Sequence, residues 1–179
     1  MIVGSIKEDL TLEKRISITP ETAKNIIGLG LKVFIEKDYA NHLGINDNDY
    51  KAIGVEIKNS PSDVLNQCNL LIRVNCPSPN EISDLKENTI LIGMINPSKN
   101  KNHINDLLKK KINIFSLELL PRISRAQSMD VLSSQSNLAG YRAVIDCVSE
   151  FEKAVPMMMT AAGTVPAAKV LVIGAGVAG

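Results

Sequence analysis

Short apolar runs alternate with helix-like segments along most of this chain, and this alternation constrains the fold more than any other feature. The runs are rich in Ile, Leu and Val and are too short to be core helices. They lie at residues 2–6, 31–36, 55–57, 70–74, 89–95 and 112–117. Buried strands that alternate with helices are typical of a parallel sheet covered by helices on both faces.

The segments between these runs begin with residues that start helices. Thr19 and Pro20 suit the N-cap and the first helical position, so a helix is predicted over 21–29. Ser60 and Pro61 open another, which runs to about 66. Further helices are predicted over 79–85, 102–110 and, with no Pro and a single Gly, from 130 to about 153. Another helix or turn is expected over 157–168.

The chain ends in a glycine pattern that directly follows an apolar run. Residues 169–173 read Lys-Val-Leu-Val-Ile and predict a strand, and Gly174, Gly176 and Gly179 form Gly-x-Gly-x-x-Gly. In dinucleotide-binding folds these glycines allow a tight turn, close approach of the pyrophosphate and close packing of helix on strand. Amides that open the next helix, such as that of Val177, would face the pyrophosphate. The alternative is a glycine-rich turn of any parallel sheet.

The third glycine is also the last residue, so we expect the intact protein to continue. A helix, a strand and an Asp or Glu about 20 positions further on would complete the nucleotide fold. The predicted class is α/β, with two Rossmann-like domains built on parallel sheets and the second truncated at its Gly-x-Gly-x-x-Gly turn. The predicted boundaries are 1–130 for the first domain, 131–155 for a linking helix, and 156–179 for the start of the second.

A polar segment follows the last strand of the predicted first domain. Pro121 cannot donate to a sheet ladder, so the chain leaves the sheet there. The donors and acceptors that follow are Arg122, Ser124, Arg125, Gln127, Ser128, Asp130 and Ser133. Polar loops on a rigid sheet edge often form ligand sites. The alternative is a solvated connection in which a Ser or Asp caps the next helix.

Composition excludes several classes of function. The chain has 20 basic and 19 acidic residues, which gives no electrostatic case for binding nucleic acid. No apolar run reaches the roughly 20 residues that span a bilayer. Three cysteines without metal-ligand spacing indicate a reduced, cytoplasmic compartment. His42 and His103 are far apart, so no metal site is predicted, and Arg15 is expected to pair with a carboxylate of the fold.

Two long motifs carry a family resemblance. Residues 121–144, from Pro-Arg-Ile-Ser-Arg-Ala-Gln-Ser-Met-Asp to Asn-Leu-Ala-Gly-Tyr-Arg-Ala-Val, resemble the alpha subunit of proton-translocating nicotinamide nucleotide transhydrogenase. Residues 156–179 resemble the same subunit. The opening, with Glu8, Glu13-Lys-Arg15 and Thr19-Pro20-Glu21, is similar to the wider family that includes alanine dehydrogenase.

The resemblance implies NAD(H) binding in a cleft between two α/β domains. It also implies NADP(H) on a partner domain, hydride transfer between the two cofactors, and proton translocation by membrane-embedded domains. No catalytic residue is implied, because hydride passes between cofactors. A homodimer, peripheral at the cytoplasmic face of the inner membrane, is expected. The implied cofactor-binding residues are Arg122, Ile123, Ser124, Arg125, Ala126, Gln127, Asp130, Ser133, Gly174, Gly176, Val177 and Gly179.

Two other functions stay open. Alanine dehydrogenases resemble this chain but carry a lysine after the strand matching 70–74 and a histidine at the end of the strand matching 89–95. This chain has Arg73 near the first position and Met94-Ile95-Asn96 at the second. Without the histidine, the acid/base step of that family lacks its residue. The third possibility is a module that senses NAD(H) without turnover.

Overall fold

The computed structural model describes residues 1–179, which form two compact units, Met1–Leu120 and Pro121–Gly179. The division follows Leu120, directly before the proline that was predicted to leave the sheet. The domain boundaries at 130 and 155 stay predictions.

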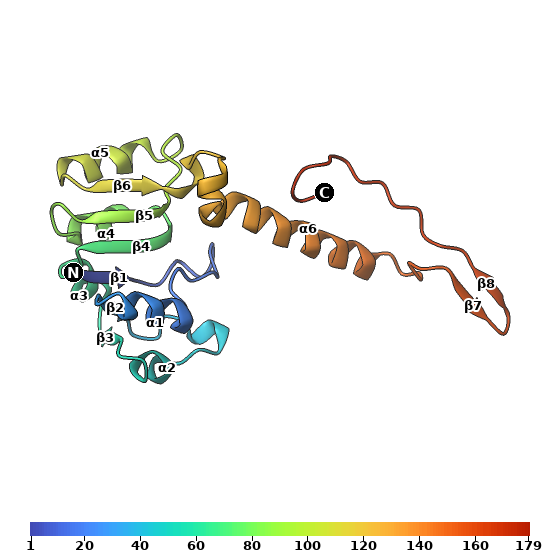
Figure 1. Cartoon of the computed structure of the whole chain (residues 1–179), viewed down its shortest axis with the longest axis horizontal. Coiled ribbons are helices and arrows are strands. Elements are labelled where there is room, and N and C mark those ends of the chain that lie inside the picture. The colour runs from blue at the N-terminus through green and yellow to red at the C-terminus, as the bar shows by residue number, and fades with distance from the viewer. The chain divides into compact units, whose positions relative to one another are not determined.

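The first unit contains one six-stranded sheet in which every neighbouring pair is parallel (Figure 1). Its strands are β1 (Ile2–Ser5), β2 (Lys32–Glu36), β3 (Glu56–Lys58), β4 (Leu70–Asn75), β5 (Ile90–Met94) and β6 (Asn113–Ser116). Their order, β3-β2-β1-β4-β5-β6, is that of a doubly wound sheet whose winding direction reverses between β1 and β4. The predicted α/β class and Rossmann-like parallel sheet are confirmed.

The helices of this unit mostly begin where the sequence predicts. They are α1 (Pro20–Gly28), α2 (Asp47–Lys51), α3 (Pro61–Leu65), α4 (Pro79–Asp84) and α5 (Lys101–Lys109), with 3-10 turns η1 (Asn41–Leu43) and η2 (Leu117–Leu119). The hydroxyls of Thr19, Ser60 and Ser78 cap α1, α3 and α4, and each cap precedes a proline. Helix α2 was not predicted, because this short polar helix buries only Tyr50.

Apolar side chains pack on both faces of the sheet. Helices α3, α4 and α5 supply Val64, Ile82 and Leu107 to the cluster that contains Leu71 and Leu91. Helices α1 and α2 supply Ala23 and Tyr50 to the cluster on the other face, with Val33 and Ile35 of β2. Each large side chain that is fully buried contributes about 1.5–3 kcal/mol, so these two clusters fix the position of the strand ends.

The second unit contains a 3-10 turn η3 (Ser124–Met129), the 20-residue helix α6 (Val131–Glu150), and the strands β7 (Met158–Thr160) and β8 (Gly163–Val165). The long helix is confirmed. The helix or turn expected over 157–168 is wrong, since β7 and β8 pair there as an antiparallel hairpin. The strand expected over 169–173 is also wrong in this structure, because no neighbouring strand pairs with that run. None of the helices, α6 included, combines the length and the apolar character that a membrane span requires.

Candidate functional site

The polar segment between Pro121 and α6 contains a six-residue 3-10 helix, η3, rather than an open loop throughout. Ile123 is extended at its start, and the turn η3 ends at Met129. The implied cofactor-binding residues Arg122, Ile123, Ser124, Arg125 and Gln127 are exposed, whereas Ala126 is buried. The arginine and amide donors of this segment therefore lie at the surface of the chain, where a ligand can reach them.

Asp130 caps α6. Its carboxylate accepts hydrogen bonds from the Ser133 backbone N–H at 2.9 Å and from the Ser133 hydroxyl at 2.6 Å. These bonds lower the pKa of Asp130, slight burial opposes them, and the nearby Arg122 guanidinium lowers the pKa further. One alternative reading of this segment was a solvated connection in which a Ser or Asp caps the next helix. The structure confirms the cap, and Asp130 provides it.

The glycine pattern at the chain end contains a bend at residues 176–177. Gly174 has a φ angle of +104°, a backbone conformation that residues other than glycine rarely adopt. A Cβ on Gly179 would lie 2.5 Å from the Gly174 carbonyl oxygen, so the two ends of the turn are in close contact. A Cβ on Gly176 would meet nothing within 4 Å. The backbone is therefore open at Gly176, the position where the expected pyrophosphate would approach.

Helix α6 lies against this turn. A Cβ on Gly140 would come within 2.1 Å of the Ala178 carbonyl oxygen, a distance that only glycine accommodates. The structure thus brings the turn to the helix that Asp130 caps. It records no direct contact between the residues of 122–133 and those of 174–179.

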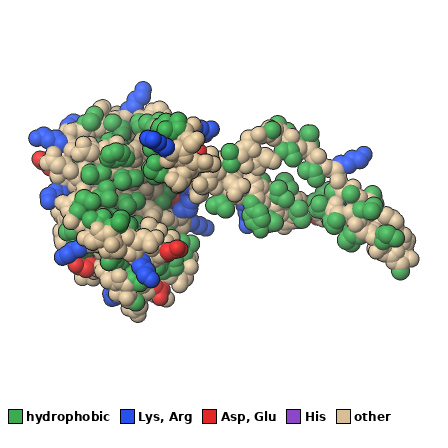
Figure 2. All heavy atoms as spheres, viewed as in Figure 1, with side chains coloured by type: hydrophobic (Ala, Val, Ile, Leu, Met, Phe, Trp, Pro, Cys, Tyr) green, Lys and Arg blue, Asp and Glu red, His purple; other side chains and the backbone are tan.

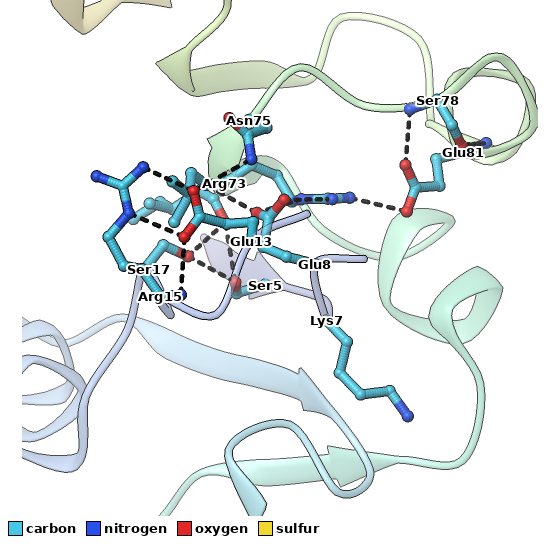
Figure 3. Close-up of polar contacts among 12 residues, drawn as sticks. Ser5, Lys7, Glu8, Glu13, Arg15, Ser17, Arg73, Asn75, Ser78 and Glu81 are labelled. Atoms are coloured by element: carbon cyan, nitrogen blue, oxygen red, sulfur yellow. Dashed lines mark hydrogen bonds and ion pairs between the residues drawn. The ribbon is translucent and has the colours of Figure 1, made fainter. Parts of the chain in front are cut away.

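A second polar group lies in the first unit, at the carboxyl ends of β1 and β4 (Figure 3). Arg73 of β4 is 5% exposed and donates from Nε and Nη2 to both carboxylate oxygens of Glu8, each at 2.9 Å. Its Nη1 donates to Glu81 at 2.8 Å. The Val74 backbone N–H, at an irregularity in the β4–β5 register, donates to Glu8 at 2.8 Å. The buried guanidinium is held from two sides.

The pKa of Arg73 reflects this arrangement. Burial is the largest influence and lowers the pKa of Arg73, but the hydrogen bonds and charges of Glu8 and Glu81 together outweigh it, so the pKa lies above its ordinary value. An arginine in this state stays charged at every accessible pH.

Arg15, in the segment that follows β1, is held by Glu13. Its backbone N–H and Nε donate to Glu13 Oε1 at 2.9 Å, and Nη2 donates to Oε2 at 2.6 Å. The hydrogen bond from Arg15 is the largest influence on Glu13 and lowers its pKa to about 2. The ion pair that the sequence predicted for Arg15 is confirmed.

The meeting of Glu8, Arg73 and Glu81 was not predicted from the sequence. The available signal was positional: Glu8 follows β1, Arg73 lies near the end of β4, and the carboxyl ends of parallel neighbours meet at one edge of the sheet. No group of three or more His, Cys, Asp or Glu side chains in the chain has the geometry to hold a metal ion.

Comparison with known proteins identifies the family. The model described as "Alanine dehydrogenase/PNT, N-terminal domain" matches residues 4–139, and "Alanine dehydrogenase/PNT, C-terminal domain" matches residues 143–179. An NAD(P) transhydrogenase subunit alpha protein of Rhodospirillum rubrum is 46% identical over 184 residues, which cover all of this chain and 48% of the relative. An alanine dehydrogenase of Methanococcus maripaludis is 29% identical over 182 residues, covering all of this chain and 48% of that protein.

A solved structure gives the same assignment. The crystal structure of transhydrogenase from Sinorhizobium meliloti matches with a TM-score of 0.94 and 42% identity, and covers all of this chain and 53% of that one. The chain thus spans about half the length of the relatives it matches. Both family models and the most similar of these proteins agree, and the chain belongs to the alanine dehydrogenase/nicotinamide nucleotide transhydrogenase (PNT) family.

Proposed function

We propose that this chain is the amino-terminal portion of the NAD(H)-binding subunit of a transhydrogenase, which passes hydride between NAD(H) and NADP(H). In this proposal the NADP(H) site and the proton path belong to partner subunits or domains with membrane-embedded segments. The NAD(H)-binding subunit forms a homodimer and is held at the cytoplasmic face of the membrane through its complex. The greater identity to the transhydrogenase relative than to the alanine dehydrogenase, 46% against 29%, supports this choice within the family.

The observation that carries the proposal is the pairing of both arginines with carboxylates near the carboxyl ends of β1 and β4. In open α/β sheets, ligands bind beyond the carboxyl ends of the strands, where the winding direction reverses. An amino-acid dehydrogenase needs a cation for the substrate carboxylate and a general base. Here Arg73 is bonded to Glu8 and Glu81, and Arg15 to Glu13. The end of β5 carries Met94 and then Ile95 and Asn96, none of which transfers protons.

The residues assigned to NAD(H) are those of the polar segment and the glycine turn. Arg122, Arg125 and Gln127 would orient the nicotinamide carboxamide and nearby phosphate, with Ile123, Ser124 and Ala126 forming the turn that presents them. Asp130 and Ser133 would fix Arg122 and the start of α6. Gly174, Gly176, Val177 and Gly179 would receive the pyrophosphate. When bound, the nicotinamide supplies the hydride chemistry, and the protein supplies orientation and exclusion of water.

A chimera tests the proposal. This chain is joined at Gly179 to the remaining half of the Rhodospirillum rubrum relative, and NADH binding and L-alanine oxidation are measured. We expect NADH to bind and L-alanine-dependent reduction of NAD to be undetectable. Reduction of NAD by L-alanine at an enzyme-like rate would refute the proposal in favour of an amino-acid dehydrogenase.

A further inference from the structure

Helix α6 contains one glycine, Gly140, and the backbone of the glycine pattern at 174–179 lies directly against it. A Cβ on Gly140 would lie 2.1 Å from the Ala178 carbonyl oxygen, 2.9 Å from the carbonyl carbon and 3.1 Å from the Cα of the same residue. All three are backbone atoms, which cannot rotate away as the end of a flexible side chain can. A side chain at position 140 must therefore displace the segment that contains Ala178.

A glycine at the centre of a helix weakens that helix. Gly140 lies in the middle of the 20-residue helix α6, where glycine is less favourable than alanine by about 1 kcal/mol. The preceding residue, Ala139, is an alanine. The close approach of the 174–179 backbone is a contact that only glycine permits, and it accounts for this one exception in the helix.

The contact at Gly140 does not belong to a packed apolar core. No residue of α6 is fully buried, and its large apolar side chains are exposed, as the hydrophobic groups along this part of the chain show in Figure 2. Leu138, Tyr141 and Val144 are each more than half exposed. Backbone rather than side chain lies against Gly140, so this contact fixes a position and buries little apolar surface.

The face of α6 that carries Gly140 also carries Ser133. Residues seven positions apart lie about two turns apart on the same face of a helix. Ser133 donates to the carboxylate of Asp130 from its backbone N–H and its hydroxyl, so the polar segment is joined to α6 at the first turn of the helix. Gly140 lies about 15 Å further along the helix axis than Asp130. One helix therefore connects the two groups of residues to which NAD(H) binding is assigned.

We propose that Gly140 is a positioning residue, which lets α6 hold the backbone of 174–179 at a fixed distance from the polar segment 122–130. For the identity of the ligand, this inference rests on the proposed function. In that function the polar segment orients the nicotinamide and the glycine pattern receives the pyrophosphate. Two parts of one ligand bind together only where their sites keep the right spacing. Gly140 acts through the backbone of 174–179 and not by contacting the cofactor.

Gly140→Ala tests the position of the glycine pattern without any cofactor. In the chain 1–179 the added methyl group should move the 174–179 backbone, so we expect the amide NMR signals of Gly174, Gly176 and Val177 to shift. The melting temperature should not fall, because alanine favours a helix more than glycine does. The matched control is Ala139→Ser, which adds one non-hydrogen atom at the adjacent exposed position and should leave these signals unchanged. Unchanged signals in Gly140→Ala would overturn the proposal.

NADH binding tests the effect of Gly140 on the site. In the chimera with the remaining half of the Rhodospirillum rubrum relative, Gly140→Ala should raise the Kd for NADH at least about tenfold, because a displacement on the order of 1 Å misplaces bound groups. Ala139→Ser should leave this Kd unchanged. A lower melting temperature with an unchanged Kd, or failure of Gly140→Ala to fold, would overturn the proposal, because Gly140 would then serve packing alone. If the chimera with Gly140 intact binds no NADH, the proposed function fails, and the NMR signals decide by themselves whether Gly140 positions the glycine pattern.

Discussion

At the scale of single residues, the partners of an arginine say more about its function than its position does. Arg73 and Arg15 both lie where an α/β sheet binds ligands, yet carboxylates of the same domain hold them. Arg122 and Arg125 lie in an exposed segment beside Gln127. We therefore propose that the second pair of arginines binds the ligand and that the first pair stabilises the fold.

Gln127 is expected to position the nicotinamide. In the chimera assembled with its NADP(H)-binding partner, Gln127→Asn shortens the side chain by one methylene and moves its amide by about 1 Å. A misplacement of this size can decrease the transfer rate about 100-fold. NADH affinity should change much less, because the glycine turn still binds the phosphates, and the melting temperature should not change. Equally small effects on rate and affinity would show that 121–133 is an ordinary connection.

Glu13 is expected to make stability depend on acid pH. Its pKa is about 2 in the fold against an ordinary value of 4.5, so the Glu13–Arg15 pair stabilises the fold above about pH 4.5 and loses this effect as the pH falls towards 2. Glu13→Gln should therefore destabilise the chain at pH 7 but much less at pH 2.5, as measured by urea unfolding. Glu87→Gln, at an exposed position, is the control and should change the free energy of unfolding at neither pH. If Glu13→Gln decreased the free energy of unfolding equally at pH 7 and pH 2.5, the pH dependence could not be assigned to the Glu13–Arg15 pair.

At the scale of elements, carboxylates at the ends of strands and helices connect one element to the next. The carboxylates of Glu8 and Glu81 tie the end of β1 and the start of α4 to β4. The carboxylate of Asp130 caps the start of α6. The two groups can be tested separately, because they lie in different units.

Removal of Glu8 should destabilise the first unit strongly. Glu8→Ala leaves Arg73, 5% exposed, with one carboxylate partner and removes the acceptor of the Val74 N–H. Breaking a buried ion pair from one side costs about 3–5 kcal/mol. The control is Asp106→Ala, which removes an exposed pair with Lys109 and should cost less than about 0.5 kcal/mol. Similar free energies of unfolding for the two variants would argue against a structural function for the buried network.

Asp130 substitutions separate the helix cap from the charge. Asp130→Asn keeps a good N-cap, whereas Asp130→Ala removes the cap and should cost about 1 kcal/mol. If the charge also orients Arg122 toward NADH, Asp130→Asn should weaken NADH binding by the chimera while its melting temperature is unchanged. Retention of full NADH affinity by Asp130→Asn would leave Asp130 as a helix cap only.

The elements show which features the sequence could predict. Local signals were sufficient for α1 and α3, because Thr19-Pro20 and Ser60-Pro61 encode their own caps. The run 169–173 has strong strand character but forms no strand here, since a strand needs a neighbour that its own sequence does not encode. The pairing of Glu8 with Arg73 depends on the strand order, which no local pattern reveals.

At the scale of the whole molecule, the chain spans about half the length of its relatives and contains a six-stranded doubly wound sheet, a long helix and the glycine pattern at 174–179. The run 169–173 belongs to no sheet of this structure.

The most direct test of the proposed function is hydride exchange by the completed subunit. The chimera, mixed with the NADP(H)-binding partner of the Rhodospirillum rubrum relative, is given NADH and an NADP analogue, and formation of the reduced analogue is followed by absorbance. We predict exchange that requires both proteins and that is lost without the partner. Bound NADH with no exchange, under conditions in which the relative's own subunit is active, would contradict the transhydrogenase assignment and indicate an NAD(H)-sensing module.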